Sequence, residues 1–153
     1  MAPDAKRHVI LLADDDVDDR DMTLKALARA GLAYEFYSVG DGEELLDFLR
    51  HSGKYAAPAL SPAPGLILLD LNMPKKDGRE ALAEIKADRA LRRIPVVVMT
   101  TSKSEQDIFR TYDLGSNSFI SKPITLPKLV EVMTVLGQYW FQIVTLPEAV
   151  GGG

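Results

Sequence analysis

Carboxylates, a hydroxyl and an ammonium group follow the short apolar runs of this 153-residue chain. They belong to Asp14, Asp15 and Asp16 after the first run, and to Asp70, Thr100 and Lys122 after later ones. In an open parallel sheet, ligands bind beside the carboxyl ends of the strands. If the apolar runs are strands of such a sheet, these side chains meet at one edge and form a candidate site.

Carboxylates crowded at one edge repel one another, so the site must either hold a proton at a raised pKa or bind a cation. Carboxylate oxygens with a backbone carbonyl and waters suit Mg²⁺, which shares its remaining positions with phosphate oxygens. Lys122 adds a fixed positive charge, and Thr100 can donate a hydrogen bond to a phosphoryl oxygen. An aspartate that is ionised near pH 7 is ready to attack. These residue types therefore predict metal-assisted phosphoryl chemistry.

Strand-like runs alternate with amphipathic stretches along the chain. We expect buried strands at residues 8–13, 34–39, 65–69, 95–99 and 118–121. The stretches between them carry apolar residues at helical spacing. This alternation predicts an α/β fold, with a doubly wound, five-stranded parallel sheet, five flanking helices and right-handed crossovers.

Capping residues mark several expected helix ends. Asp41 and Ser104 are each followed three positions later by an acid, as in a capping box. Gly31 and Gly115 stand where two helices are expected to end. Asp77 is interpreted as the N-terminal cap of the helix between the third and fourth strands.

Four sequence blocks coincide with the polar strand ends. They are ILLADDD at 10–16, LDLNMPKKDG at 69–78, PVVVMT at 95–100 and FISKP at 119–123. In order and spacing, these blocks resemble the signature blocks of response-regulator receiver domains of two-component signalling, and the resemblance spans residues 8–136. It implies a flavodoxin-like strand order, 2-1-3-4-5, and a phosphoacceptor signalling domain with self-catalysed phosphotransfer and autodephosphorylation, not an enzyme.

The resemblance implies a role for each residue of the acidic site. Asp70 is the implied phosphoacceptor, and it also faces a divalent metal, Mg²⁺ or Mn²⁺. Asp15 is expected to hold this metal directly, and Asp14 mainly through water. Asn72 is expected to contribute its backbone carbonyl.

The resemblance also implies a conformational switch. Thr100 matches the hydroxyl that moves toward the phosphoryl group, and Phe119 matches the aromatic that changes rotamer with it. Lys122 matches the lysine that pairs with the site, and its bond to Pro123 is expected to be cis. The change is expected to bias the face built from the fourth helix, fifth strand and fifth helix.

The C-terminal segment extends beyond the fifth helix that a minimal receiver needs. Its aromatic and apolar residues either pack back on the domain or bury against a second copy of the chain, and we expect a dimer interface at Tyr139, Trp140, Phe141 and Ile143. We expect residues 1–7 to be disordered, 8–138 to form the receiver domain, and 139–153 to form the extension and tail.

The extension and a proline-rich loop at 51–64 resemble the single-domain regulators paired with bacterial phytochrome kinases. The implied partners are a histidine kinase, for which such a bacteriophytochrome is the candidate, a second copy in a homodimer, and an unidentified downstream protein. No effector domain is expected to follow, so output is expected to pass through that protein.

Composition excludes several functions. The net charge of −4 provides no overall basic field for nucleic acid, and zero cysteines exclude disulfides and thiolate metal sites. Apolar runs fall short of the roughly 18 residues that span a bilayer, and no secretory signal follows the start. We therefore expect a cytoplasmic protein that binds neither nucleic acid nor membrane.

The same residues also bear on other functions. Asp14, Asp16 and Asp18 have the spacing of a calcium loop, but Asp19 and Lys25 replace the glycine and glutamate that such a loop needs. Asp18 and Asp19 are interpreted as favourable charges at a helix N-terminus. An aspartate-based phosphatase, a flavodoxin-type module without a Gly-rich phosphate loop, and a phosphorylation-independent interaction module remain as alternatives.

Overall fold

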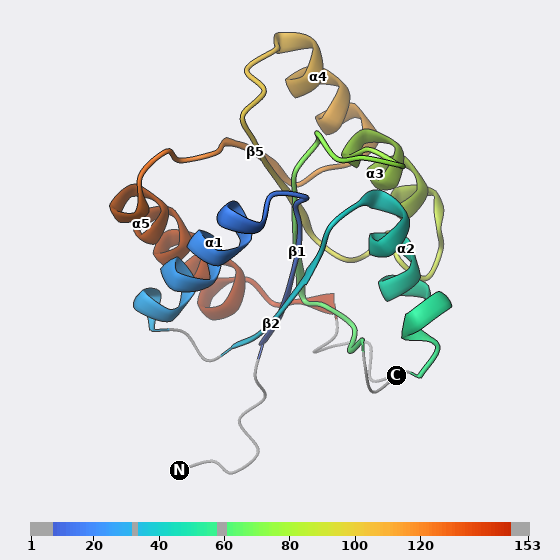
Figure 1. Ribbon diagram of the computed structural model, residues 1–153, viewed down its shortest axis with the longest axis horizontal. Coiled ribbons are helices and arrows are strands. Elements are labelled where there is room, and N and C mark those ends of the chain that lie inside the picture. The colour runs from blue at the N-terminus through green and yellow to red at the C-terminus, as the bar shows by residue number, and fades with distance from the viewer. Residues whose placement is uncertain (1–7, 32–33, 58–60, 148–153) are drawn as a thin grey trace.

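Five parallel strands form one sheet in the computed structural model of this chain, in the order β2-β1-β3-β4-β5. The structure describes residues 8–31, 34–57 and 61–147. Helices cover both faces of the sheet (Figure 1). The predicted doubly wound α/β fold and its strand order are therefore confirmed. The segment 1–7, predicted to be disordered, lies outside the described residues.

The strands are short and lie close to the predicted ranges. They are β1 (His8–Ala13), β2 (Tyr34–Val39), β3 (Leu66–Leu69), β4 (Val96–Thr100) and β5 (Ser118–Ser121). Every residue of β3 and β4 is buried, because each strand lies between two others and under helices on both faces. The edge strands β2 and β5 keep partly exposed side chains.

Five α-helices flank the sheet in the described part of the chain. They are α1 (Val17–Ala30), α2 (Gly42–Arg50), α3 (Gly78–Ala87), α4 (Glu105–Leu114) and α5 (Leu126–Gly137). Helices α1 and α5 pack side by side on one face, and α2, α3 and α4 lie on the other (Figure 1). Each face therefore has its own apolar core cluster, and the two clusters are separated by the sheet.

The predicted caps set the helix ends. Asp41, Asp77 and Ser104 each accept backbone hydrogen bonds from the first turn of their own helix. Gly31 and Gly115 end α1 and α4 with φ of 73° and 108°, a conformation that glycine adopts without steric cost. These caps fix where the loops at the strand ends begin and stop.

The C-terminal extension continues α5 as a π-helical turn, η3 (Gln138–Ile143). Trp140 is buried in the core cluster beneath α1 and α5, and the Phe141 ring stacks on the His8 ring with centroids 4.2 Å apart. Tyr139 and Ile143 point away and keep 51% and 71% of their surface exposed. Trp140 and Phe141 thus pack back on the domain, so they do not lie on an exposed dimer face, whereas the burial of Tyr139 and Ile143 against a second copy stays a prediction.

The loop at 51–64 is largely exposed and contains a short 3₁₀ turn, η1 (Gly53–Tyr55). His51 ends α2 with a positive φ of 56°, and its Nδ1 lies 2.8 Å from the buried Ser61 hydroxyl. This contact ties the two ends of the loop together. Residues 58–60 lie outside the described part.

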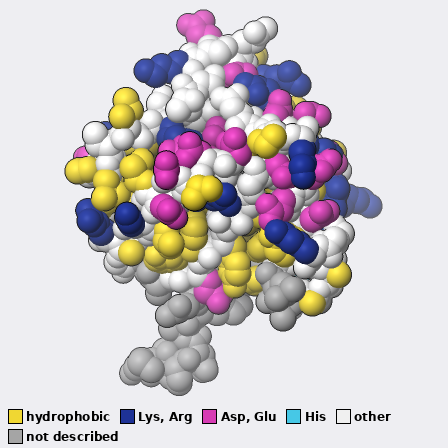
Figure 2. All heavy atoms as spheres, viewed as in Figure 1, with side chains coloured by type: hydrophobic (Ala, Val, Ile, Leu, Met, Phe, Trp, Pro, Cys, Tyr) yellow, Lys and Arg dark blue, Asp and Glu magenta, His cyan; other side chains and the backbone are white. Residues whose placement is uncertain are grey.

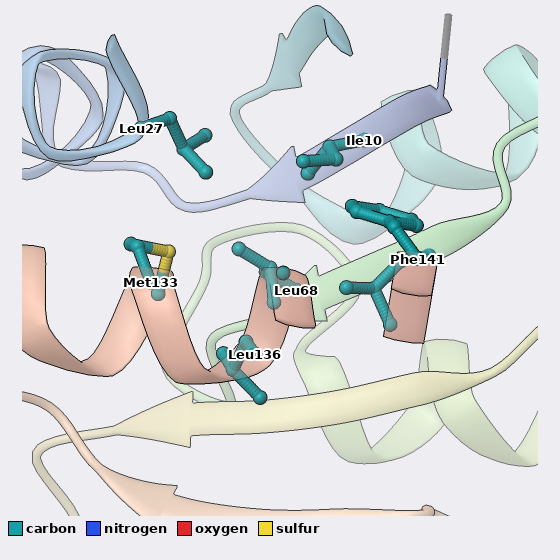
Figure 3. Close-up of a pocket in the computed structure, with 8 residues that line it drawn as sticks. Ile10, Leu27, Leu68, Met133, Leu136 and Phe141 are labelled. Carbon is teal, nitrogen blue, oxygen red and sulfur yellow. The ribbon is translucent and has the colours of Figure 1, made fainter. Parts of the chain in front are cut away.

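A small cavity lies between the sheet, α1, α5 and η3 (Figure 3). It is lined by apolar side chains and one glycine: Ile10, Leu27, Leu66, Leu68, Met133, Leu136, Gly137 and Phe141. Because no charged or hydrogen-bonding side chain lines it, the cavity is a gap in core packing and not the site of the predicted chemistry. No helix in the described ranges combines the length and hydropathy that crossing a bilayer requires.

Candidate functional site

The predicted carboxylates meet where β1 and β3 end. The Asp14 N–H donates to the Val39 carbonyl, and the Asp70 N–H donates to the Ala13 carbonyl, both at 3.0 Å. These backbone bonds extend the ladder by one residue and place the two aspartates side by side. Carboxylate oxygens of Asp14, Asp15 and Asp70 all lie within 4.8 Å of one another. Figure 2 shows acidic side chains gathered over this end of the sheet.

Asp70 is buried, and three donors hold its carboxylate. The Thr100 hydroxyl donates to Oδ1 at 2.9 Å, and the Asn72 backbone N–H donates to the same oxygen at 3.3 Å. Lys122 Nζ donates to Oδ2 at 3.1 Å. The carboxylate is therefore fixed in orientation by groups from three different strand ends.

Lys122 joins several acids at once. Its Nζ donates to Asp14 Oδ2 and Asp19 Oδ2 at 2.8 Å each, and to Asp70 Oδ2 at 3.1 Å. Burial disfavours the charged ammonium, but its hydrogen bonds to the Asp14 and Asp19 carboxylates outweigh that effect, so the pKa of Lys122 lies well above its ordinary value. The lysine thus remains a fixed positive charge at any physiological pH.

Asp14 is almost fully buried while Asp15 beside it is exposed. Burial raises the pKa of Asp14 above its usual value, and hydrogen bonds from Lys122 and the Asp16 N–H offset part of that rise. A cation bound beside Asp14 would stabilise the ionised form of its carboxylate, which burial disfavours. Three carboxylates, one of them open to water, match the oxygen donors that a hard divalent cation prefers.

Asp19 is the site residue that the sequence did not reveal. The sequence indicates a favourable charge at a helix N-terminus, and Asp19 does stand in the first turn of α1. Its carboxylate also reaches Lys122, which lies 103 positions away in the sequence. No local pattern reports a contact over that separation.

A second network crosses the neighbouring loop. Arg79 on α3 donates from Nε and Nη2 to the two carboxylate oxygens of Asp107 on α4, at 2.8 and 2.7 Å. The Ser102 hydroxyl donates to the same carboxylate at 2.6 Å. Hydrogen bonds from Arg79 and Ser102 lower the pKa of Asp107 to about 2. This network fixes the loop that follows Thr100, and the capping motif at Ser104 had not predicted it.

The proposed switch residues lie on adjacent strands. Phe119 on β5 is half-buried, and its backbone N–H donates to the Tyr112 hydroxyl at 3.1 Å. The predicted cis bond between Lys122 and Pro123 is wrong, because the described residues contain no cis peptide bond. With the bond to Pro123 in the trans form, Lys122 Nζ contacts the carboxylates of Asp14, Asp19 and Asp70. The trans isomer is favoured by about 0.5–1 kcal/mol in X–Pro bonds.

Gly78, the first residue of α3, packs against the backbone of the Asp70 loop. Its N–H donates to the Leu71 carbonyl at 2.9 Å, and a Cβ added here would lie 2.3 Å from the Asp70 carbonyl oxygen. Only glycine permits this approach. The loop that carries Asp70 and Asn72 is therefore held by the end of the next helix.

Comparison with known proteins gives consistent matches over nearly the whole chain. The model of the response regulator receiver domain family matches residues 10–134. Response regulator Rcp1 of Synechocystis sp. is 43% identical over 141 residues, which are 92% of this chain and 94% of that protein.

Two solved structures are also similar. The phosphorylated cyanobacterial phytochrome response regulator RcpA has 44% sequence identity and a TM-score of 0.86, with coverage of 93% of this chain and 99% of that one. The Mn²⁺-bound form of response regulator Rcp1 has 42% identity and a TM-score of 0.82, with coverage of 92% and 99%. The strand order, the acidic cluster and these matches agree, and the chain belongs to the response regulator receiver domain family, a family of signalling domains.

Proposed function

We propose that this protein is the phosphoacceptor of a two-component phosphorelay and that Asp70 receives the phosphoryl group. The observation that carries the proposal is the position of Asp70, whose carboxylate lies between Lys122, Thr100 and the acidic cluster. Around an attacking oxygen, these groups supply the positive charge and the hydrogen-bond donor that phosphoryl transfer requires.

In the proposed transfer, an Asp70 oxygen attacks phosphorus and a new P–O bond forms. The P–N bond to the kinase imidazole breaks, and the nitrogen keeps the electron pair and takes up a proton from water. Autodephosphorylation follows when a water oxygen attacks the same phosphorus, the P–O bond to Asp70 breaks, and inorganic phosphate leaves. Acetyl phosphate can replace the kinase, with acetate as the leaving group.

Each site residue has a proposed part in this reaction. Asp14, Asp15 and Asp70 would hold Mg²⁺ or Mn²⁺ together with the Asn72 backbone carbonyl, and the metal would neutralise phosphoryl charge. Lys122 exchanges its contact with Asp70 for a phosphoryl oxygen, and the Thr100 hydroxyl moves its hydrogen bond in the same way. These roles follow from donors that already face the Asp70 carboxylate.

Intact mass after incubation with acetyl phosphate and Mg²⁺ tests the proposal. Wild-type protein should gain the mass of one phosphoryl group, and the gain should disappear on chelation. Asp70→Asn should show no gain, whereas Asp77→Asn, a cap on the same loop, should still be labelled. Labelling of Asp70→Asn to the wild-type level would refute the assignment, and so would metal-independent labelling.

We also propose that the donor is a histidine kinase of the phytochrome type and that the protein acts in the cytoplasm. The support is the similarity to a regulator described as a cyanobacterial phytochrome response regulator. In this proposal, Thr100 and Phe119 change conformation on phosphorylation, and a downstream protein binds the changed surface. Competition among purified kinases for transfer to Asp70 would identify the partner by rate.

We further propose that residues 8–138 form the receiver and that the extension joins two copies in a homodimer. Val135, Tyr139 and Ile143 are exposed to 60%, 51% and 71%, and each follows the last by four positions, about one turn of α5 and η3. Such an apolar stripe is a candidate for burial against a second copy. Trp140 and Phe141 would serve this interface indirectly, by holding η3 on the domain.

Sedimentation analysis of Tyr139→Glu with Ile143→Glu tests the homodimer. The double variant should sediment as a monomer at concentrations where the wild type is dimeric. Phe109→Glu on α4 is the matched control, since Phe109 is also an exposed aromatic. Dissociation by Phe109→Glu alone would place the interface on α4 instead.

A further inference from the structure

The Lys122 ammonium has three N–H donors, and three carboxylates accept from it. Two of them, Asp14 and Asp70, belong to the cluster suited to a cation, and the third, Asp19, does not. All three contacts lie between 2.8 and 3.1 Å. An arriving phosphoryl oxygen can bond to Lys122 only by taking the place of one of these acids.

Asp19 is held firmly in this position. The Asp16 cap accepts the Asp19 N–H at 3.1 Å, and the Asp19 carbonyl accepts the hydroxyl of buried Thr23 at 2.9 Å. The first turn of α1 therefore fixes the backbone of Asp19, and the bond from Lys122 Nζ orients its carboxylate. Asp18, its neighbour, shares the cap and the helix N-terminus but is exposed and makes no ion pair with Lys122 among the described contacts.

We propose that Asp19 is a positioning residue that holds the Lys122 ammonium toward α1, favours cation binding in the site and opposes the phosphoryl anion. The inference rests on the proposed function, since it assigns a brake on the same phosphorylation. Asp19 adds a negative charge close to Asp70 without being a metal ligand. Its charge therefore strengthens the binding of a cation beside Asp70 and weakens the binding of an anion there.

The size of the effect follows from distance. Asp19 Oδ2 and Asp70 Oδ2 contact the same Nζ at 2.8 and 3.1 Å, so they lie within about 6 Å of each other. The Asp19 side chain is about one-third exposed, which gives partial solvent screening. With solvent screening that corresponds to an effective dielectric of about 40 to 80, a unit charge at that distance changes affinity by roughly three- to tenfold.

The test compares Asp19→Asn with Asp18→Asn, which removes an equal charge one residue away. Mn²⁺ affinity is measured by electron paramagnetic resonance of the free ion, and beryllofluoride, a mimic of the phosphoryl group, is titrated by ¹⁹F NMR at saturating Mg²⁺. We expect Asp19→Asn to weaken Mn²⁺ binding and strengthen beryllofluoride binding, each roughly three- to tenfold. Asp18→Asn should change either by less than about twofold, and Asp19→Glu should restore both.

A purely structural role for Asp19 predicts weaker binding of both probes, so loss of both affinities in Asp19→Asn would overturn the inference. Equal effects of Asp18→Asn and Asp19→Asn would overturn it as well. Circular dichroism checks the fold first, and Asp19→Ser replaces Asp19→Asn if the latter does not fold. A wild type that binds Mn²⁺ but neither beryllofluoride nor a phosphoryl group would refute the proposed function, and the Mn²⁺ comparison would then decide the inference alone.

Discussion

The Asp70 carboxylate has donors on both oxygens, Thr100 on one and Lys122 on the other. A donor to a buried charge matters more than a donor at the surface, because its removal leaves the charge short of partners where water has poor access. In the proposed phosphorylation, the same donors would bond to the incoming phosphoryl group. The proposal therefore links stability and reactivity at this residue.

Thr100→Val tests that link, because it removes the hydroxyl and keeps the shape. Thr100 is fully buried, and the lost hydrogen bond ends on a carboxylate, so we expect the free energy of unfolding to fall by about 1–2 kcal/mol. Beryllofluoride affinity should fall too. Urea denaturation and ¹⁹F NMR measure the two effects, and Thr101→Val at the exposed neighbour is the control. Equal stability losses in both variants would show that the hydrogen bond from Thr100 to Asp70 does not stabilise the fold.

At the scale of elements, ion pairing between α3 and α4 controls the loop after Thr100. Arg79 holds Asp107 with two hydrogen bonds, and Asp107 in turn holds Ser102. The Ser102 N–H lies 3.4 Å from the Thr100 hydroxyl oxygen. The two helices and the Thr100 hydroxyl are thus connected through the Asp107 carboxylate.

This connection predicts a pH dependence of stability. The pKa of Asp107 is about 2 in the folded chain against 3.8 for a free side chain, so its stabilisation is complete above about pH 4 and is lost as pH falls toward 2. After allowance for solvent screening, the contribution is about 1–2 kcal/mol. Asp107→Asn should lower stability by that amount at pH 7 and by progressively less below pH 4. Glu105→Gln in the same turn removes an acid that makes no ion pair among the described contacts, so it should lower stability at pH 7 by less than Asp107→Asn does. A pH-independent loss in Asp107→Asn would contradict the ion-pair account.

Contact between α3 and the Asp70 loop gives a second prediction at this scale. Gly78→Ala places a Cβ 2.3 Å from the Asp70 carbonyl oxygen, so the backbone must shift. We expect the free energy of unfolding to fall by about 1–3 kcal/mol. Helix propensity alone would favour alanine. Thermal unfolding measures the loss. Gly40→Ala, where the nearest atom would be 3.7 Å away, should be close to neutral, and a stabilised Gly78→Ala would show that the close approach does not constrain the loop.

At the scale of the whole molecule, the C-terminal extension completes one of the two cores. Trp140 joins the cluster formed by β1, β3, α1 and α5, and Phe141 covers His8 at the start of β1. The extension therefore belongs to the folded unit even though it follows the last helix of the receiver pattern. Its exposed side remains available to a second copy.

Trp140→Ala should destabilise the whole domain by about 3–5 kcal/mol, because a large buried side chain is lost and a cavity remains. Circular dichroism in urea measures the change, since Trp140 is the only tryptophan and its fluorescence is lost with it. Ile143→Ala is the control on the exposed side and should cost less than about 1 kcal/mol. An equally small effect of Trp140→Ala would mean that the extension does not stabilise the core.

Much of the fold was predictable because its signals are local. Buried strands show as continuous apolar runs, and the caps at Asp41, Asp77 and Ser104 depend only on residues within one turn. The positions of Asp14 and Asp70 followed from the rule that parallel strands end at one edge. The order and chemistry of the sequence therefore determined the family, the sheet and the acids of the site.

Tertiary structure decided what depends on contacts between distant segments. The sequence could not show that Asp19 shares Lys122, that Arg79 binds Asp107, or that Trp140 faces inward while Tyr139 faces out. Side-chain contacts over 28 or 103 positions leave no periodic signal, because they depend on how helices seat against the sheet. The sequence by itself determined which groups stand at the strand ends, and only the packing of the helices decided which of them touch.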